Sequence, residues 1–199
     1  MTPRTLVFAT NNDHKLSELR SILGDSYRVL GLKDIGCTDD IVEDGKSLHE
    51  NAAIKARYIR DRYGYDCLAD DTGLLVDALD GAPGVHTARY AGDGHDSSAN
   101  MRLLLHNLRD ISDMDRRSAR FMTVIALTDG DDILYFEGKA EGYIALAPRG
   151  DKGFGYDPVF IPQGSGLTFA EMDSDMKNSI SHRGNAVRNL INYLASNQK

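Results

Sequence analysis

The sequence lacks the features that mark secreted, membrane-spanning and disulfide-bonded proteins. Its two cysteines, Cys37 and Cys67, are too few for a disulfide framework or a zinc cage, so we expect two small buried thiols. No apolar run approaches the ~20 residues that a membrane helix needs. Residues 1–8 lead directly into a strand-like segment, without the apolar core of a signal peptide. We therefore expect a cytoplasmic protein that has no membrane partner.

Basic residues are also scarce relative to acidic ones. The chain has 23 Lys and Arg against 30 Asp and Glu, which gives a formal net charge of −7. Binding to nucleic acid depends on Lys and Arg that neutralise phosphates, so the charge predicts that nucleic acid is not a partner. A small phosphorylated substrate stays possible, because a metal ion bound by acidic side chains can supply positive charge.

Internal repeats, low-complexity segments and long polar linkers are absent as well, so we predict a single domain over residues 1–199. The order of apolar patterns predicts a mixed α/β fold, with an Asp129-Gly130 turn in a hairpin. The predicted strands are 6–9, 27–30, 66–69, 121–127 and 133–136. Three predicted helices have apolar faces, at residues 16, 19, 22 and 23; at 101, 104, 105 and 108; and at 187, 190, 191 and 194. A fourth predicted helix runs from a capping box at Ser47 and Glu50 to about Tyr63.

The segment from Thr10 to Lys15 follows the first predicted strand and opens the first predicted helix. Free N–H groups and the positive dipole end at a helix N-terminus bind phosphate oxygens readily, and Lys15 would add an ammonium group. The Gly-x-x-x-x-Gly-Lys pattern of a Walker loop is missing. The segment therefore indicates either a phosphate loop or an ordinary capped helix with a solvent-facing lysine.

Two adjacent carboxylates, Asp70 and Asp71, end a predicted buried strand. Open α/β sheets place ligands at such strand ends, and magnesium is commonly bound by one or two carboxylates together with phosphate oxygens. The alternative is an Asp-rich turn. Glu43 is a possible second acid, although by itself it reads as a turn glutamate.

Two later segments carry candidate groups for substrate binding. In residues 153–160, glycines flank Phe154 and leave its ring able to stack on a purine or to pack under a loop. In residues 177–184, Lys177, His182 and Arg183 stand before or within the first turn of the final predicted helix, where cations oppose the helix dipole. An anionic ligand would explain these cations, and so would a solvated surface.

Taken together, these segments resemble the inosine/xanthosine triphosphate pyrophosphatase family, whose members remove non-standard purine nucleotides from the nucleotide pool. The resemblance extends over nearly the whole chain. It rests on six motifs in the family's order, at residues 9–15, 50–56, 69–74, 81–92, 153–160 and 177–183.

The resemblance implies a fold and a set of site residues. The fold would be elongated α/β, with a central mixed, curved sheet, flanking helices and two lobes around an active-site cleft. Asp71 would be the general base, and Glu43 and Asp71 would bind Mg²⁺. His14 stands where the family commonly has a small residue. The implied substrate contacts are Thr10, Asn11, Asn12, Asp13, His14, Lys15, Lys55, Thr72, Phe154, Gly155, Tyr156, Asp157, Lys177, His182 and Arg183.

The implied activity is magnesium-dependent hydrolysis of ITP, dITP and XTP to the nucleoside monophosphate and pyrophosphate, carried out by a homodimer. A nucleotidyl-transfer or kinase-like enzyme would need a second acceptor, for which the sequence shows no motif. A nucleotide sensor would bind without turnover, which the intact acidic residues argue against. The sequence leaves open the ranking of the three nucleotides, the means by which guanine is rejected, and the roles of Asp70 and Arg89.

Overall fold

The computed structural model describes residues 3–196, and for His14, Glu18, Ser21 and Ile22 it describes the backbone without the side chain. The chain divides into two compact units that alternate along the sequence. Unit 1 holds the described residues of Met1–Asp71, Val124–Phe136 and Val187–Lys199, and unit 2 holds Thr72–Thr123 and Glu137–Ala186. Among the described residues, no helix is both long enough and apolar enough to cross a membrane.

The central sheet is mixed, as predicted, and has seven strands in the order β2-β1-β3-β5-β6-β7, with β4 paired to β3. Strand β1 is parallel to β2 and to β3, whereas β4 is antiparallel to β3 and β7 is antiparallel to β6. The strands are Arg4–Phe8 (β1), Tyr27–Gly31 (β2), Cys67–Val76 (β3), Pro83–Gly84 (β4), Ser118–Asp129 (β5), Asp132–Ile144 (β6) and Phe160–Pro162 (β7).

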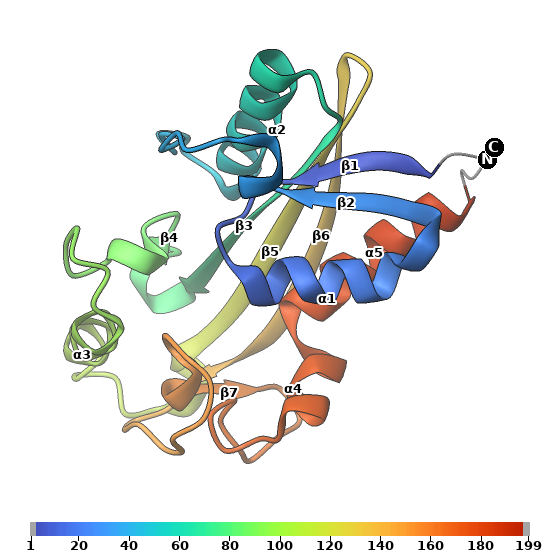
Figure 1. Cartoon of the computed structure of the whole chain (residues 1–199). Helices are drawn as coiled ribbons and strands as arrows, with labels where there is room; N and C mark the ends of the chain where they lie inside the picture. The colour runs from blue at the N-terminus through green and yellow to red at the C-terminus, as the bar shows by residue number, and fades with distance from the viewer. Residues whose placement is uncertain (1–2, 197–199) are drawn as a thin grey trace. The chain divides into compact units, whose positions relative to one another are not determined.

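Helices flank the sheet in both units (Figure 1). In unit 1, α2 lies on one side of β1 and β2, while α1 and the C-terminal part of α5 lie on the other. The α-helices are Asp13–Leu23 (α1), Leu48–Tyr63 (α2), Ser97–Asn107 (α3), Ser174–Ile180 (α4) and His182–Ser196 (α5). Short 3-10 helices occupy Gly24–Ser26, Lys33–Ile35, Asp77–Leu79, Thr87–Arg89, Met114–Arg117 and Asp157–Val159.

Helix α2 begins at the residue that the capping signal predicted. The Ser47 side chain accepts a hydrogen bond from the Glu50 amide at 3.1 Å, and Gly64 ends the helix with a φ of 72°. The Glu50 carboxylate accepts from the Lys46 amide at 2.6 Å, so the return bond reaches one residue further back than a capping box requires. This bond joins α2 to the loop that precedes it.

Burial follows the predicted apolar pattern. In unit 1, β1 buries Leu6, Val7 and Phe8, and α1 turns Leu16, Leu19 and Leu23 inward, while the side chain of Ile22 lies outside the described residues. In unit 2, Phe121, Phe160 and Phe169 pack together at the centre of the core. Both cysteines are buried and free, as predicted, and burial raises the pKa of the Cys67 thiol to about 12.

The structure corrects the predicted boundaries at two places. Strand β3 continues to Val76, so Asp70 and Asp71 lie inside a strand, and the alternative of an Asp-rich turn is wrong. Lys177 belongs to α4, a short helix of its own, and not to the approach of the final helix. The final helix begins at His182, where Ser181 accepts a hydrogen bond from the Gly184 amide at 3.1 Å.

Candidate functional site

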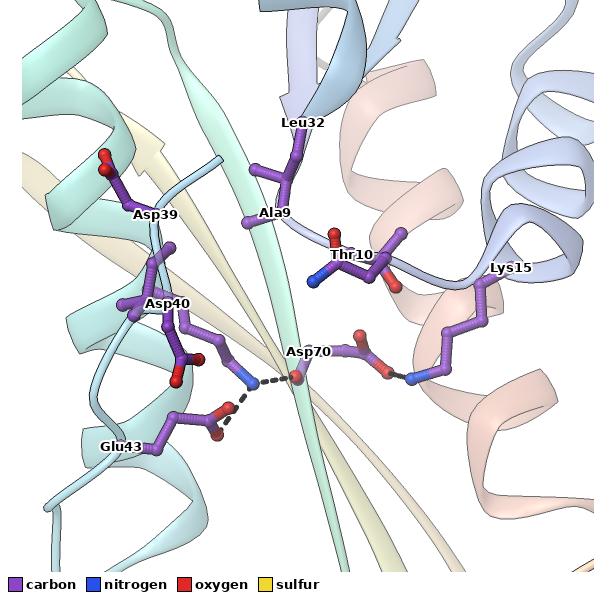
Figure 2. A pocket seen from close by; sticks show the side chains of 11 residues that line it. Ala9, Thr10, Lys15, Leu32, Asp39, Asp40, Glu43 and Asp70 are labelled. Atoms are coloured by element: carbon purple, nitrogen blue, oxygen red, sulfur yellow. Dashed lines mark hydrogen bonds and ion pairs between the residues drawn. The ribbon is translucent and has the colours of Figure 1, made fainter. Parts of the chain in front are cut away.

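A pocket of about 210 Å³ lies in unit 1, where the C-terminal end of β1 meets the start of α1, the loop before α2 and strand β3 (Figure 2). Its walls are mostly polar and carry charges of both signs. The lining residues are Ala9, Thr10, Asn11, Lys15, Leu32, Asp39, Asp40, Ile41, Glu43, Lys55 and Asp70.

The first wall of the pocket is the N-terminus of α1. The Asn12 side chain accepts a hydrogen bond from the Lys15 amide at 3.2 Å, which caps the helix. The Thr10 hydroxyl oxygen accepts from the Asn12 amide at 3.2 Å and tightens the turn that leaves β1. The sequence prediction of a strand, a polar turn and a capped helix is confirmed here, and this end of the helix borders the pocket.

Lys15 reaches across the pocket to the strand. Its ammonium nitrogen lies 2.6 Å from Oδ2 of Asp70, a carboxylate that is only 6% exposed. A carboxylate buried to this degree needs a charged partner or several hydrogen bonds. Lys15 therefore does not face solvent, and it contacts an acidic side chain. That acid is Asp70, whose role the sequence left open.

Lys55 approaches the same point from α2. Its ammonium donates to Oε2 of Glu43 at 2.9 Å and to the main-chain oxygen of Asp70 at 2.8 Å. Glu43 and Asp70, which both accept from this nitrogen, lie near each other in the pocket (Figure 2). The two lysines thus balance the charge of acidic groups in the pocket. When those acidic groups bind another cation, the lysines can donate to phosphate oxygens instead.

The donor set of the pocket fits a hard cation such as Mg²⁺. Carboxylate and carbonyl oxygens are the ligands that Mg²⁺ prefers, and it usually keeps water molecules and takes phosphate oxygens as further ligands. Over the part of the chain that the structure describes, no three His, Cys, Asp or Glu side chains are grouped so that they could hold a metal ion. A cation here would therefore bind weakly by itself, and phosphate oxygens of a substrate would complete its set of ligands.

Asp71 is half-buried in β3 and does not line this pocket, whereas Asp70 does. Successive side chains of a strand point to opposite faces, so Asp70 and Asp71 present their carboxylates on different sides of β3. Thr72 follows, and its hydroxyl lies 2.8 Å from that of Thr123 within unit 2.

Unit 2 carries the predicted aromatic loop. Phe154 is 70% exposed, while Tyr156 and Asp157 are buried. Oδ2 of Asp157 accepts from the Phe154 amide at 2.8 Å, and a Cβ at Gly153, whose φ is 76°, would overlap this carboxylate. The loop is folded around Asp157 and leaves the Phe154 ring uncovered, which supports the stacking interpretation over the packing one.

Lys177 lies against the same loop. Its ammonium is 2.6 Å from Oδ2 of Asp157 and 5.1 Å from the centre of the Phe154 ring. An ion pair and a cation–π contact hold the side chain in place. Lys177 is therefore part of the loop's framework, and Asp157 contacts both the lysine and the main-chain amide of Phe154.

His182 and Arg183 open α5. The His182 ring is 8% exposed and stacks on Phe121, with ring centres 4.7 Å apart and planes inclined by 19°. Arg183 is half-buried, and its buried Nε has no hydrogen-bond partner among the described residues. A buried guanidinium donor of this kind fits a polar ligand group.

The remaining predicted contacts are spread over both units. Asp13 is exposed and lies 3.5 Å from Lys33 in an ion pair, and the side chain of His14 lies outside the described residues. The Tyr156 hydroxyl donates to the Thr87 carbonyl at 2.9 Å, and burial raises the pKa of this phenol.

Sequence reasoning missed two pocket acids, Asp39 and Asp40. Both lie in the irregular loop between the Lys33–Ile35 3-10 helix and α2. They precede Glu43 by four and three residues. The sequence offered one signal, a run in which four of the six residues from Asp39 to Asp44 are acidic.

Comparisons with known proteins give the family of the chain. The sequence profile of the Ham1 family matches residues 6–193. A protein of Porphyromonas gingivalis named dITP/XTP pyrophosphatase is 53% identical over 189 residues, which cover 95% of this chain and 96% of that protein. The Ham1 protein structure from Staphylococcus aureus has a TM-score of 0.92 at 34% identity, covering 98% of this chain and 100% of that one. A HAM1 protein structure from Coxiella burnetii has a TM-score of 0.91 at 40% identity, covering 97% and 99%. The chain therefore belongs to the Ham1 family.

Proposed function

We propose that this protein hydrolyses ITP, dITP and XTP to the nucleoside monophosphate and pyrophosphate, and so removes non-standard purine nucleotides before they enter DNA and RNA. The observation that carries the proposal is the pocket of unit 1, in which Lys15 and Lys55 meet Glu43 and Asp70 beside the N-terminus of α1. The P. gingivalis relative bears the name of this activity.

In this account the groups of unit 1 hold the triphosphate. The Thr10–Lys15 segment presents amides, a hydroxyl and the Lys15 ammonium, all of which donate to phosphate oxygens. Lys55 donates from the opposite wall. The resemblance assigns both Glu43 and Asp71 to Mg²⁺, but only Glu43 lines the pocket. Glu43 and phosphate oxygens would hold the ion there, where it would neutralise charge and make the α-phosphorus more open to attack.

Asp71 is assigned as the general base that orients and deprotonates the attacking water. The family resemblance supports this assignment, since Asp71 stands at the position of the family's general base. Its neighbour Asp70 keeps Lys15 in the pocket through the 2.6 Å ion pair. Fixed donors that face developing negative charge lower the barrier to phosphoryl transfer without reorganisation.

Phe154, His182 and Arg183 would select the base. Phe154 would stack on the purine, a contact worth ~1–3 kcal/mol. His182 and Arg183 would donate to O6 of hypoxanthine or xanthine. The amino group of adenine would leave such donors unpaired, which costs several kcal/mol. The buried Nε of Arg183 supports this role.

The homodimer and the cytoplasmic location expected from the sequence belong to the same proposal. Size-exclusion chromatography with light scattering tests the dimer, because a mass of one chain, 21.9 kDa, would contradict it.

The decisive test of the activity is an analysis of products. Purified protein incubated with ITP and Mg²⁺ is expected to release pyrophosphate and IMP, and to turn over ATP far more slowly. Asp71→Asn should lower kcat by orders of magnitude, because no base would remain to orient the water. Asp70→Asn should mainly raise KM, since it releases Lys15 without removing the base. Release of orthophosphate, or full activity of Asp71→Asn, would contradict the proposal.

A further inference from the structure

The loop that carries Glu43 has no regular secondary structure, yet α2 holds it at several points. The Gly45 amide donates to Oδ1 of Asn51 at 2.9 Å, and Glu43 accepts from Lys55. Asp39, which comes earlier in the loop, accepts from Tyr58 and Tyr63 in the C-terminal half of the helix. The loop thus runs along α2 in the reverse direction.

All of the helix residues that make these contacts, except Tyr63, share one face. Asn51, Lys55, Tyr58 and Arg62 are spaced at i, i+4, i+7 and i+11, which places them in a stripe along α2. A Cβ at Gly45 would lie 2.7 Å from Oδ1 of Asn51, so this end of the loop approaches the helix as closely as a glycine permits. The loop is therefore anchored to the stripe at both ends.

Asp39 is the anchor at the far end. Its Oδ2 accepts hydrogen bonds from the Tyr58 hydroxyl at 2.8 Å and the Tyr63 hydroxyl at 3.0 Å, and lies 3.2 Å from Nε of Arg62. The two hydroxyl donors and the guanidinium hold the pKa of the Asp39 carboxyl below its usual range. At neutral pH this contact is ionic and charge-assisted.

Asp39 borders the pocket, but its carboxylate does not face the other acids. Figure 2 shows it directed away from Glu43 and Asp70. The carboxylate is already engaged by three donors from α2, which leaves it poorly placed to bind a cation beside Glu43. Its contacts point to a role in holding the loop.

We infer that Asp39, held by Tyr58, Arg62 and Tyr63, is a positioning residue that fixes the loop carrying Glu43 for cation binding. Glu43 is held by Lys55, a contact that must loosen when the carboxylate takes up a cation. The loop therefore needs anchors independent of Lys55. Asp39 supplies one anchor and Gly45 supplies the other. Residues 40–44 are therefore already ordered when the cation binds, and binding does not have to order them.

The test compares three variants of the full chain with the wild type. Tyr58→Phe/Tyr63→Phe removes both hydroxyl donors without changing any charge, and Asp39→Asn removes the charge of the anchor. Asp44→Asn is the matched control, because it removes the same charge from an exposed position of the same loop. Binding of Mn²⁺ alone is measured from the electron paramagnetic resonance signal of the free ion, and hydrogen exchange is followed in a peptide covering residues 38–47.

The double tyrosine variant and Asp39→Asn are both expected to raise the Mn²⁺ dissociation constant by about tenfold, the usual effect of losing a group that orients a metal ligand. Exchange should quicken in residues 38–47, while Tm and exchange in β1 should match the wild type. Asp44→Asn should change the dissociation constant less than about twofold, because its charge is exposed and screened.

Three results would overturn the inference. If the tyrosine variant binds Mn²⁺ as tightly as the wild type while Asp39→Asn binds it weakly, Asp39 is itself a ligand. If Tm falls and exchange quickens throughout α2, the contact is merely structural. If the wild type shows no Mn²⁺ binding, no cation site exists for the loop to serve. The inference rests on the proposed cation site, but a wild type that binds Mn²⁺ and fails to hydrolyse ITP contradicts only the proposed function.

Discussion

The two lysines of the unit 1 pocket have different partners, and this difference sets their roles. Lys15 meets a side-chain carboxylate of a buried residue, Asp70. Lys55 meets a side chain and a main-chain oxygen, which fixes its nitrogen from two directions. Turning Lys15 toward phosphate breaks its contact with the Asp70 carboxylate, whereas moving Lys55 breaks its contacts with Glu43 and with the main chain.

Phe154 provides the sharpest prediction for a single residue. Phe154→Ala should raise KM for ITP by about tenfold or more, because the lost stacking is worth ~1–3 kcal/mol. Stability should not change, since the ring is 70% exposed. Steady-state kinetics check the first expectation and thermal unfolding the second. Phe154→Tyr, which keeps the ring, serves as the control, and an unchanged KM in Phe154→Ala would remove this residue from the binding site.

Among the elements, the junction of the Met114–Arg117 3-10 helix with β5 depends on one buried cation. Arg117 is 2% exposed and donates to the main-chain oxygens of Leu108, Ile111, Ile144 and Ala145 at 2.7–2.9 Å. Burial lowers the pKa of this guanidinium, which nevertheless stays protonated. It thereby ties the end of α3 to the end of β6 within unit 2.

Arg117→Met should lower the free energy of unfolding by about 3–5 kcal/mol, because four carbonyl groups lose a charged donor. That loss corresponds to a fall in Tm of roughly 10 °C. The matched control is Arg116→Met, one residue earlier and exposed, which should change stability by less than about 0.5 kcal/mol. Chemical denaturation measures both, and equal losses in the two variants would contradict the assignment.

Elements with a strong local signal were predictable. Apolar periodicity and the Ser47 cap predicted α2, and the Asp129-Gly130 pair predicted the hairpin between β5 and β6. The length of β3 was not predictable, because Asp70 is stabilised inside a strand by Lys15, 55 residues away in sequence. The split between α4 and α5 does have a local signal in the sequence, because Asp173 caps α4 and Ser181 caps α5.

The site was predictable by type of residue more than by arrangement. Lys15, Glu43 and Lys55 were expected and do share a pocket. Which of two adjacent carboxylates faces that pocket depends on the register of β3, which β1 sets by pairing Phe8 with Leu68. The anchoring of Asp39 by Tyr58 and Tyr63 is likewise a tertiary contact without a local pattern.

For the whole molecule, the scarcity of protein ligands predicts that the metal serves catalysis and not folding. Among the side chains that the structure describes in residues 3–196, no group of three could hold a metal ion. EDTA should therefore abolish hydrolysis while leaving Tm within roughly 2 °C, because weak binding to the native state adds little stability. Activity assays and differential scanning fluorimetry test this together, and a large fall in Tm on chelation would reveal a structural metal.

The most direct test of the central claim is to follow oxygen-18 from water during hydrolysis of ITP with Mg²⁺. Attack on the α-phosphorus breaks the bond between the α- and β-phosphates and places the label in the monophosphate. Mass spectrometry should therefore find one labelled oxygen in IMP and none in pyrophosphate. Label in pyrophosphate or in orthophosphate would show attack on a different phosphorus and would contradict the account.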